Sequence, residues 1–600
     1  MPEKTCVTDP FTIEIIKEAL IAAADEMFIT LGRTSKSTII YETLDYACGI
    51  TDAEGGLIAQ ANGVTGFQGV LTYTVKSVLE KFGAEGLKPG DVIVTNDPYS
   101  GGGTHLSDVA LVAPIFYEGE LIAFSANKAH WTEVGGMALG SWTTDATEIY
   151  QEGLQLPNVK IWEEGRVNQA LIDLIAANVR TPDMTLGDLY AGAASLKTGE
   201  RRVLEICKKY GVQAVREAIA DMYLRGEENT RQALARLPKG TFVSDGYIDD
   251  DGLSDDPIYV KTTITITDDK FTVDITGTSP QVLGPVNCSF TATKCAVRTI
   301  FMALTDPRFP ANEGCFKPLE VVGPPGTIFS CQRPASVSTY WETMAYVSDL
   351  VWKALAPHMP DRLTAGHFLS VCGTIVGGVD SKTKETFILV EPQAGGWGAG
   401  CDKDGESGLV CSGDGETFVI PVEVAEIRYP IIVEQFSFNP SPKGAGKFRG
   451  GKGLIRDYRI VNEGGAELTA TFGRYKFLPW GVAGGEEGSP NMVQYIPAGQ
   501  SEPVLEKGKV ARLKLKNGDL VRLITGNGGG WGDPLERDPE LVRQDVKNGF
   551  VTVEDALEKY GVVLLPETME VDGGATEKLR KQKRKERAGE TDGNGPGKAG

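Results

Sequence analysis

The segment between residues 91 and 130 limits the possible folds of this chain most strongly, because it contains two of its four histidines. The run NDPYSGGGTHLSD places His105 and Asp108 at the end of a glycine-rich loop. Two strand-like runs follow, DVALVAPIF and LIAFSANKA, and the second ends beside His130. Adjacent antiparallel strands return the chain to the side from which it left. We therefore expect His105, Asp108 and His130 to lie close together.

These three residues have the chemistry of a metal site. Two imidazoles and one or two carboxylates suit zinc, iron(II) or manganese(II) and do not select strongly among these ions. Asp45, in YETLDYACGITD, is the candidate for a fourth ligand, and Glu42 competes with it. Asp97 precedes the glycines and is a candidate to orient a ligand histidine. The same spacing also fits a hydrogen-bonded loop histidine and an unrelated buried one.

The glycine run before His105 allows two interpretations. Gly101, Gly102 and Gly103 are able to cradle an anion with their backbone N–H groups. They equally permit a tight turn beside the site. No GxxxxGK[ST] motif and no Gly-x-Ser-x-Gly motif occurs in the sequence, which disfavours a Walker-type ATPase and an α/β-hydrolase triad.

The length of the chain predicts several domains, because 600 residues exceed what one hydrophobic core usually organises. Helical and strand-like segments together indicate a mixed α/β (α+β), multidomain fold. The predicted units are an N-terminal α/β domain with the metal site and a helical segment (1–238), an α+β middle domain (239–360), a glycine-rich and β-rich domain (361–535), C-terminal helices (536–577) and a disordered basic tail (578–600).

Local signals predict individual elements within these units. Asp9-Pro10 is typical of a helix start, and that helix should continue to about Leu31. The run YVKTTITITDDKFTVDITGT alternates and is β-branched, so it predicts a hairpin that turns at Asp268-Asp269. Further expectations are a strand pair within 36–60, helices over 70–83, 291–304 and 340–357, a mostly helical stretch from 166 to 237, and short helices over 536–562.

Charge and targeting signals exclude several classes of protein. A net charge of −21 disfavours nucleic acid or an anionic membrane as the main partner. Residues 1–10 lack the basic start and apolar run of a secretion signal, and charged residues interrupt the apolar ones of 11–31. The ten cysteines form no CxxC pair. We therefore expect a cytoplasmic protein with reduced thiols.

Several longer motifs, read in order, resemble the hydantoinase B/oxoprolinase family from about Asp9 to about Val563. They are NDPYSGGGTHLSDVALVAPIF, AHWTEVGG, EIYQEGLQLPNVKIWEEGRVN, GPVNCSF, ANEGCFKPLEVVGPPGTIFSCQRPASVS, GKFRGGKGL and GNGGGWGDPLERDPELVRQDVKNGFV. The resemblance implies one half of an ATP-dependent enzyme, whose hydantoinase A-like ATPase subunit phosphorylates a carbonyl substrate. In such relatives a metal lies on the residues that match His105, Asp108 and His130, with an acid from the region of Asp45 or Glu42.

The resemblance leaves three functions open. The first is a cyclic amide hydrolase of the hydantoinase or 5-oxoprolinase type, in which Glu42 or Asp45, whichever does not bind the metal, serves as base. The second is a subunit of a ketone carboxylase of the acetone or acetophenone type, and the third is a non-catalytic scaffold subunit. Many hydrolytic members resemble NIKERLDFS where this chain has IIYETLDYA, and they carry a histidine near HLG where it has Phe67 and Gln68.

Overall fold

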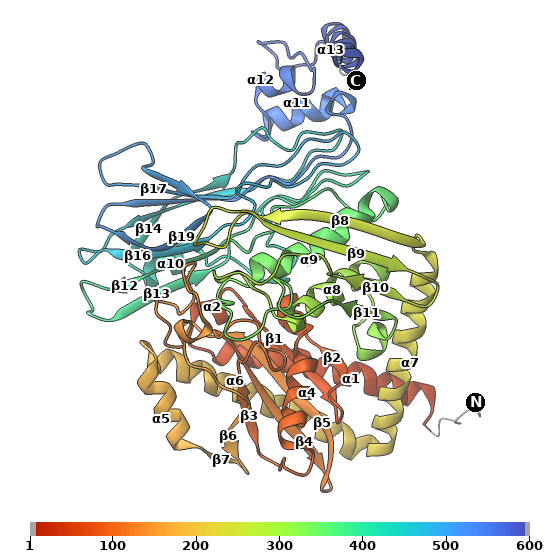
Figure 1. The fold of residues 1–600 in the computed structure, drawn as a ribbon, viewed down its shortest axis with the longest axis vertical. Coiled ribbons are helices and arrows are strands. Elements are labelled where there is room, and N and C mark those ends of the chain that lie inside the picture. Colours follow the sequence, from red (N-terminus) through yellow and green to blue (C-terminus); the bar gives the residue numbers. More distant parts are fainter. Residues whose placement is uncertain (1–7, 594–600) are drawn as a thin grey trace, which may run out of the picture.

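The computed structural model describes residues 8–593, and residues 1–7 and 594–600 lie outside the described part. Figure 1 shows the N-terminal region in red and orange at one end, the middle region in yellow and green, and the C-terminal region in cyan and blue beyond it. Each region combines helices with at least one sheet of its own. The predicted mixed α/β, multidomain fold class is confirmed.

The N-terminal region is built on a seven-stranded sheet with the order β2-β1-β5-β4-β3-β6-β7. The mostly apolar runs of its central strands fit a sheet that is covered on both faces, and most of the residues of these strands are buried. The strands are β1 (Tyr46–Asp52), β2 (Leu57–Gln60), β3 (Val92–Thr95), β4 (Asp108–Tyr117), β5 (Glu120–His130), β6 (Val159–Glu163) and β7 (Arg166–Val167).

Helices cover both faces of this sheet. Helix α1 (Pro10–Thr34) starts as predicted, because the side chain of Asp9 accepts hydrogen bonds from the N–H groups of Phe11 and Thr12. It packs on α6 (Pro182–Tyr210), which in turn contacts β4 and β5, while α4 (Leu71–Phe82) contacts the same strands and forms a separate apolar cluster with them. The remaining helices here are α2 (Thr38–Tyr41), α3 (Thr65–Gln68), α5 (Gln169–Asn178) and α7 (Val212–Arg236).

The hairpin of β4 and β5 confirms the central expectation from the sequence. The two strands are antiparallel neighbours, and their register places Asp108 directly opposite His130. Strand β1 pairs with the other side of β5, with Tyr46 opposite Ala129. One end of the sheet therefore gathers the start of β4, the end of β5 and the residue before β1.

The middle region has a four-stranded sheet, β11-β10-β9-β8, with two helices packed on each other and on the sheet. The predicted hairpin is present, and residues 267–270 connect β9 to β10. The elements are β8 (Gly240–Ile248), β9 (Ile258–Ile266), β10 (Phe271–Asp274), β11 (Leu319–Val322), α8 (Phe290–Thr305) and α9 (Trp341–Leu355).

The C-terminal region contains two further sheets, with the orders β13-β12-β16-β19 and β14-β15-β20-β17-β18. Long glycine-rich segments without regular structure connect their strands. The elements are β12 (Gly373–Val379), β13 (Thr386–Glu391), α10 (Val422–Arg428), β14 (Ile431–Phe438), β15 (Leu454–Ile460), β16 (Ala466–Thr471), β17 (Met492–Ile496), β18 (Leu505–Lys507), β19 (Lys509–Leu515) and β20 (Leu520–Ile524).

The hydrophobic cores do not follow the predicted domain boundaries closely. The largest core extends from Ile13 to Val390, so it continues across residues 238 and 360. A second core, from Phe368 to Leu523, belongs to the C-terminal sheets. The predicted boundaries stay a prediction. Because the largest core continues across the junctions between the three regions, side chains from different regions meet there.

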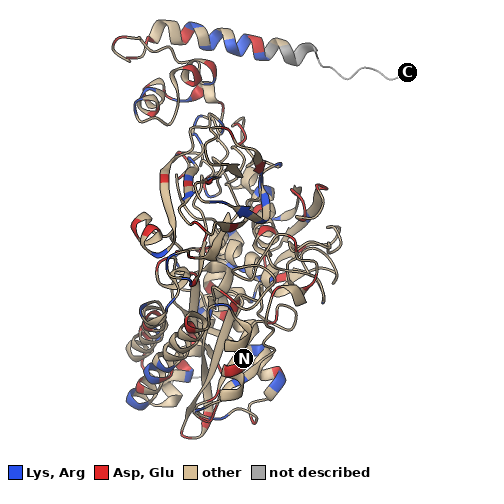
Figure 2. Cartoon of the chain, turned by 90° about the vertical axis from the view of Figure 1, so that its left-hand side faces the viewer, with Lys and Arg blue, Asp and Glu red and all other residues tan. Residues whose placement is uncertain are grey.

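A small helical unit follows the last sheet, with α11 (Pro539–Lys547), α12 (Val553–Glu558) and α13 (Gly573–Gly593). The tail predicted to be disordered from Lys578 is thus helical up to Gly593, and its last residues, 594–600, lie outside the described part. Lys, Arg, Gln and Glu favour a helix, and Arg580 donates to the carbonyl groups of Tyr560 and Arg537. Figure 2 shows this basic helix projecting from the body.

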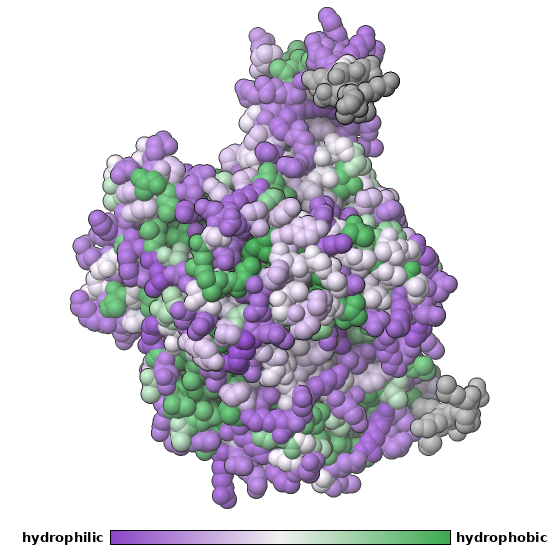
Figure 3. All heavy atoms as spheres, in the orientation of Figure 1, coloured by the Kyte–Doolittle hydropathy of each residue, from purple (hydrophilic) through white to green (hydrophobic). Residues whose placement is uncertain are grey.

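The surface in Figure 3 is mostly hydrophilic, with separate hydrophobic patches over the N-terminal and C-terminal regions. Isolated apolar residues on a surface are normal and need no partner. Within residues 8–593, no helix has both the length and the apolar character needed to cross a bilayer.

Candidate metal centre

The hairpin and the loop before it bring the three predicted ligands together. One ligand atom from each of His105, Asp108 and His130 lies within 4.8 Å of the other two. The imidazole Nε2 of His105 is 2.9 Å from Oδ1 of Asp108, and the two histidine rings are 5.1 Å apart. All three side chains are buried, with exposed fractions of 5% or less. The predicted convergence of these residues is confirmed, whereas metal binding stays a prediction.

Asp108 is held as a carboxylate in this cluster. Its Oδ2 accepts hydrogen bonds from the hydroxyl groups of Thr104, at 2.6 Å, and Tyr340, at 3.0 Å. Burial alone would raise the pKa of Asp108, but the charge and hydrogen bond of His105 and the charge of His130 outweigh it and lower that pKa to about 2. An oriented, ionised carboxylate is a good ligand for a divalent cation.

His130 has an unused ligand atom. Its Nδ1 is buried and has no hydrogen-bond partner among the described residues. Burial, together with the charge of His105, lowers the pKa of His130 to about 4, so the neutral imidazole predominates at pH 7. A neutral imidazole whose buried nitrogen lacks a partner is costly unless something occupies that position. The donor set and this free nitrogen therefore fit a divalent metal.

The two acidic candidates from the N-terminal region have different positions. The carbonyl oxygen of Asp45 accepts a hydrogen bond from the backbone N–H of His130 at 3.1 Å, and Asp45 lines the same cavity as the cluster. Burial and the nearby charge of Asp108 raise the pKa of Asp45 well above its usual value. Glu42 caps the end of α2 and is not among the residues that line the cavity. Of these two candidates, Asp45 is thus the one that lines the cavity with the cluster.

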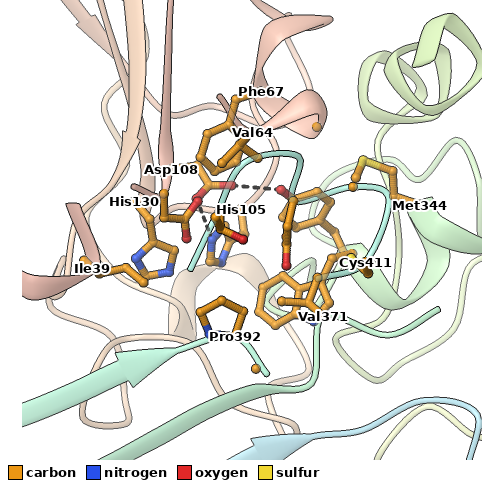
Figure 4. Close-up of a pocket in the computed structure, with 18 of the residues that line it drawn as sticks. Ile39, Val64, Phe67, His105, Asp108, His130, Met344, Val371, Pro392 and Cys411 are labelled. Carbon is orange, nitrogen blue, oxygen red and sulfur yellow. Dashed lines mark hydrogen bonds and ion pairs between the residues drawn. The ribbon is translucent and has the colours of Figure 1, made fainter. Parts of the chain in front are cut away.

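The cluster lies at one side of a cavity of about 50 Å³, taken as the space open to the centre of a water molecule. Figure 4 shows His105, Asp108 and His130 on one side, with Met344 and Cys411 across from them. All three regions contribute to the lining, which consists of Ile39, Asp45, Val64, Gly66, Phe67, His105, Asp108, His130, Trp142, Tyr340, Trp341, Met344, Ala345, Val371, Gly373, Val390, Glu391, Pro392, Cys411, Gly413, Asp414 and Thr417.

The sequence prediction missed the residues that the middle and C-terminal regions supply. Tyr340 and Trp341 lie at the start of α9, and Trp341 packs edge-on against His105 and Trp142. Asp414 lies between two glycines in CSGDGET, and burial raises its pKa to about 7. An acid flanked by glycines was the one visible signal, but nothing in the sequence connects it to a loop about 300 residues earlier.

Asp97 and the glycines serve the loop itself. Among the residues described, the carboxylate of Asp97 accepts hydrogen bonds from Tyr99 N–H, the Ser100 hydroxyl and Arg333, and from neither histidine. The role predicted for Asp97, orienting a histidine, therefore has no contact to support it. A Cβ on Gly102 would lie 1.9 Å from Oγ1 of Thr74, and Gly102 has a φ of 75°. Gly101 and Gly103 also have no room for a side chain, which favours the tight turn over the anion cradle.

Comparison with known proteins agrees with the motifs. The sequence pattern of the family described as hydantoinase B/oxoprolinase matches residues 9–534. A protein of Pseudomonas sp. (strain NS671), whose name describes the B-type subunit of a candidate D-/L-hydantoinase, is 32% identical over 96% of this chain and 98% of its own length.

Two solved structures resemble the fold. The crystal structure of ATP-dependent caprolactamase from Pseudomonas jessenii has a TM-score of 0.89 and 29% identity, over 96% of this chain and 100% of that one. The nucleotide-free structure of acetone carboxylase also has a TM-score of 0.89, over 98% of this chain and 84% of that one, but its identity of 20% shows only a common fold. The chain belongs to the hydantoinase B/oxoprolinase family, whose named relatives are enzymes.

Proposed function

We propose that this chain is the B-type component of an ATP-dependent cyclic amide hydrolase of the hydantoinase or 5-oxoprolinase type. It would act at a divalent metal site, with zinc, manganese or iron, on a carbonyl substrate that a partner subunit has phosphorylated. The observation that carries the proposal is the unpartnered Nδ1 of His130, in a buried cluster with His105 and Asp108 beside a cavity. Retention of this donor set also speaks against a non-catalytic scaffold.

The residues of the cavity have distinct roles in this proposal. His105, Asp108 and His130 would hold the metal, which when bound polarises a carbonyl oxygen and lowers the pKa of water. Asp45 is the fourth ligand or, if it remains free, the base that takes a proton from the attacking water, with Glu42 as the more distant candidate for that base. One water would add to the activated carbon, and the ring C–N bond would break as the ring nitrogen takes up a proton and leaves as an amine. A second water would then hydrolyse the resulting acyl phosphate to a carboxylate and free phosphate.

A partner subunit follows from the chemistry. An amide oxygen is a poor leaving group, and the described part of this chain contains no Walker-type phosphate-binding loop, so a hydantoinase A-like ATPase subunit would supply the phosphorylation. The relatives named as one component of a hydantoinase and as the beta subunit of caprolactamase support a hetero-oligomer, which we expect to be cytoplasmic. The aromatic wall of Trp142 and Trp341 would limit the entry of bulk water, which would otherwise hydrolyse the intermediate.

Metal analysis of the purified chain and its variants tests this proposal. His105→Ala and His130→Ala should each lose most of the bound metal and lower ATP-dependent turnover by more than about 100-fold. That is a larger loss than is typical for residues that only hydrogen-bond to a metal ligand. His358→Ala is the matched control, because His358 is exposed and packs against Phe242. Full turnover by the first two variants, with the partner present, would support the scaffold instead.

A ketone carboxylase of the acetone or acetophenone type is the second candidate, and one residue favours it. Phe67 lines the cavity in the segment where hydrolytic members carry a histidine. In that reaction water would break the O–P bond of the enol phosphate and release phosphate, and the carbon of the resulting enolate would attack carbon dioxide formed from bicarbonate. Labelled bicarbonate separates the two candidates: strict dependence on it with gain of labelled carbon indicates the carboxylase, and ring opening without it indicates the hydrolase.

A further inference from the structure

The walls of the cavity carry a chemical preference of their own. Across from the cluster the lining is apolar, with Met344, Val371 and Cys411 (Figure 4). Within residues 8–593, no lysine or arginine lines the cavity, whereas Asp45, Asp108, Glu391 and Asp414 do. A negatively charged substituent that faces this wall, away from the metal and the phosphoryl group, would therefore lose its hydration without gaining a cation.

Two buried cations beside lining residues, Lys128 and Arg456, already bind protein oxygen atoms, and of their nitrogens only Nε of Arg456 is without a partner among the described residues. Lys128 is fully buried, and its Nζ donates to the carbonyl of Gly102 at 3.0 Å. The guanidinium of Arg456 lies 3.3 Å from Glu391 and donates to the carbonyl of Ile420 at 2.7 Å. Turning either group toward a ligand would leave a buried carbonyl or carboxylate without its partner, which is unfavourable.

Polar groups without a partner, by contrast, are available in the lining. Besides Nδ1 of His130, three buried atoms of the lining have no hydrogen-bond partner among the described residues: the indole Nε1 of Trp341, Oδ2 of Asp414 and the hydroxyl of Thr417. They are one donor, one acceptor and one group that does both. An amide or imide presents the complement, an N–H and a carbonyl oxygen without net charge.

We propose that this cavity selects uncharged cyclic amides or imides with an apolar body, and that it discriminates against substrates that carry a carboxylate. The inference rests on the proposed function and narrows it toward hydantoin-like or lactam-like compounds and away from 5-oxoproline. The reacting carbonyl lies at the histidine cluster, the alkyl or aryl part contacts Met344 and Val371, and Asp414 and Trp341 recognise the polar ring edge. Burial raises the pKa of Asp414 to about 7, which lets it donate as well as accept near neutral pH.

Three γ-lactams that differ only at the ring carbon next to nitrogen test this selectivity. The substituent is isopropyl, carboxamide or carboxylate, the last being 5-oxoproline, and Kd is measured by saturation-transfer NMR on the full chain loaded with Zn²⁺ or Mn²⁺. We expect the isopropyl compound to bind tightest and the carboxylate at least about tenfold more weakly than the carboxamide, because only the carboxylate places an unpaired charge in the cavity. Equal or tighter binding of the carboxylate in the wild-type chain overturns the inference.

A charge introduced at the apolar wall sharpens the test. Met344→Lys should shift the ratio of the two Kd values toward the carboxylate by about tenfold, whereas Met344→Leu keeps the wild-type order. Carboxylate binding that vanishes with the metal but ignores Met344→Lys also overturns it, since the metal alone would then explain recognition. A chain that holds metal yet binds none of the three lactams overturns the selectivity and leaves the metal site standing. Failure of the metal-site proposal is detected separately, because the metal content of His105→Ala and His130→Ala would then equal that of the wild type.

Discussion

The two walls of the cavity are built in different ways. The wall that carries His105, Asp108 and His130 is fixed by the paired strands β4 and β5, whose register places Asp108 opposite His130. The facing wall comes mainly from the start of α9 and from irregular segments around Pro392 and Cys411. Rigid elements position the reactive groups, and loops shape the space around them. A family built this way is able to keep one chemistry while its substrates vary.

The largest expected effect tests the first wall. Asp108→Asn keeps the shape of the side chain but removes the charge that His105, Thr104 and Tyr340 surround. We expect loss of the bound metal and a fall in ATP-dependent turnover of about 1,000-fold or more, because a metal ligand is lost. Metal content and kcat are the measurements.

Asp97→Asn is the control for that change, because Asp97 belongs to the same loop but contacts only the loop and Arg333. It should retain metal and most of the turnover. An equal loss in both variants would show that folding of the loop, and not ligation, is what the first change disturbs.

A glycine pair tests how tightly the loop before His105 is packed. Gly102 and Gly119 both have positive φ, but a Cβ would lie 1.9 Å from Thr74 Oγ1 at the first and meet nothing within 4 Å at the second. Gly102→Ala should lower the free energy of unfolding by about 3 kcal/mol and Gly119→Ala by about 1 kcal/mol. Urea unfolding measures both, and similar losses would show that only backbone conformation matters at these positions.

The two walls also differ in how far the sequence predicts them. The strand pattern and the spacing of His105, Asp108 and His130 predict the first wall, because antiparallel pairing of neighbouring strands follows from local pattern. Tyr340 and Asp414 reach the cavity only through packing between regions, for which the sequence contains no periodic signal. For Asp97 the sequence predicts a contact that the structure does not have. Its position before the glycines predicts a hydrogen bond to a histidine, but its carboxylate accepts hydrogen bonds from its own loop and from Arg333.

The stability of the segment that connects the two walls should depend on pH because of Glu152. Its buried Oε1 accepts hydrogen bonds from the Ser336 hydroxyl and from the N–H groups of Val337 and Ser338, in the segment that leads to Tyr340. Burial outweighs those bonds and raises the pKa of Glu152 to about 8. The folded state then holds a proton on Glu152 that the unfolded state releases above about pH 4.5. The contribution of Glu152 to the free energy of unfolding is therefore complete below that pH and is lost as the pH rises through 8.

Glu152→Gln isolates this effect, because glutamine is neutral at every pH. The two proteins should have similar unfolding free energies at pH 5, and the wild type should be less stable by an amount on the order of 2 kcal/mol at pH 8. Urea titrations at several pH values measure the difference. A wild-type chain that gains stability over the variant with rising pH would contradict the raised pKa.

Among the residues that the structure describes, the hydroxyl of Tyr340 makes the one hydrogen bond between the second wall and the predicted metal ligands of the first. Tyr340→Phe removes the hydroxyl that donates to Asp108 and leaves Thr104 as the remaining hydroxyl donor. We expect metal affinity to fall between 10-fold and 100-fold, roughly as for other outer partners, and stability to fall by about 1 kcal/mol. Competition with a metal-binding dye measures the affinity. Unchanged affinity would mean that the second wall does not influence the metal.

The smallest effect concerns the outer edge, where Arg333 joins the glycine loop to the segment that leads to α9. Its guanidinium lies 3.2 Å from Asp97, but the side chain is 39% exposed. Solvent screens such a pair, so Arg333→Gln should change the free energy of unfolding by less than about 1 kcal/mol and leave the metal content unchanged. Thermal unfolding and metal analysis together check it. A large loss of metal would show that this ion pair, and not the strand register, aligns the loop with His130. The contrast between a wall fixed by strand pairing and a wall shaped by irregular segments would then fail.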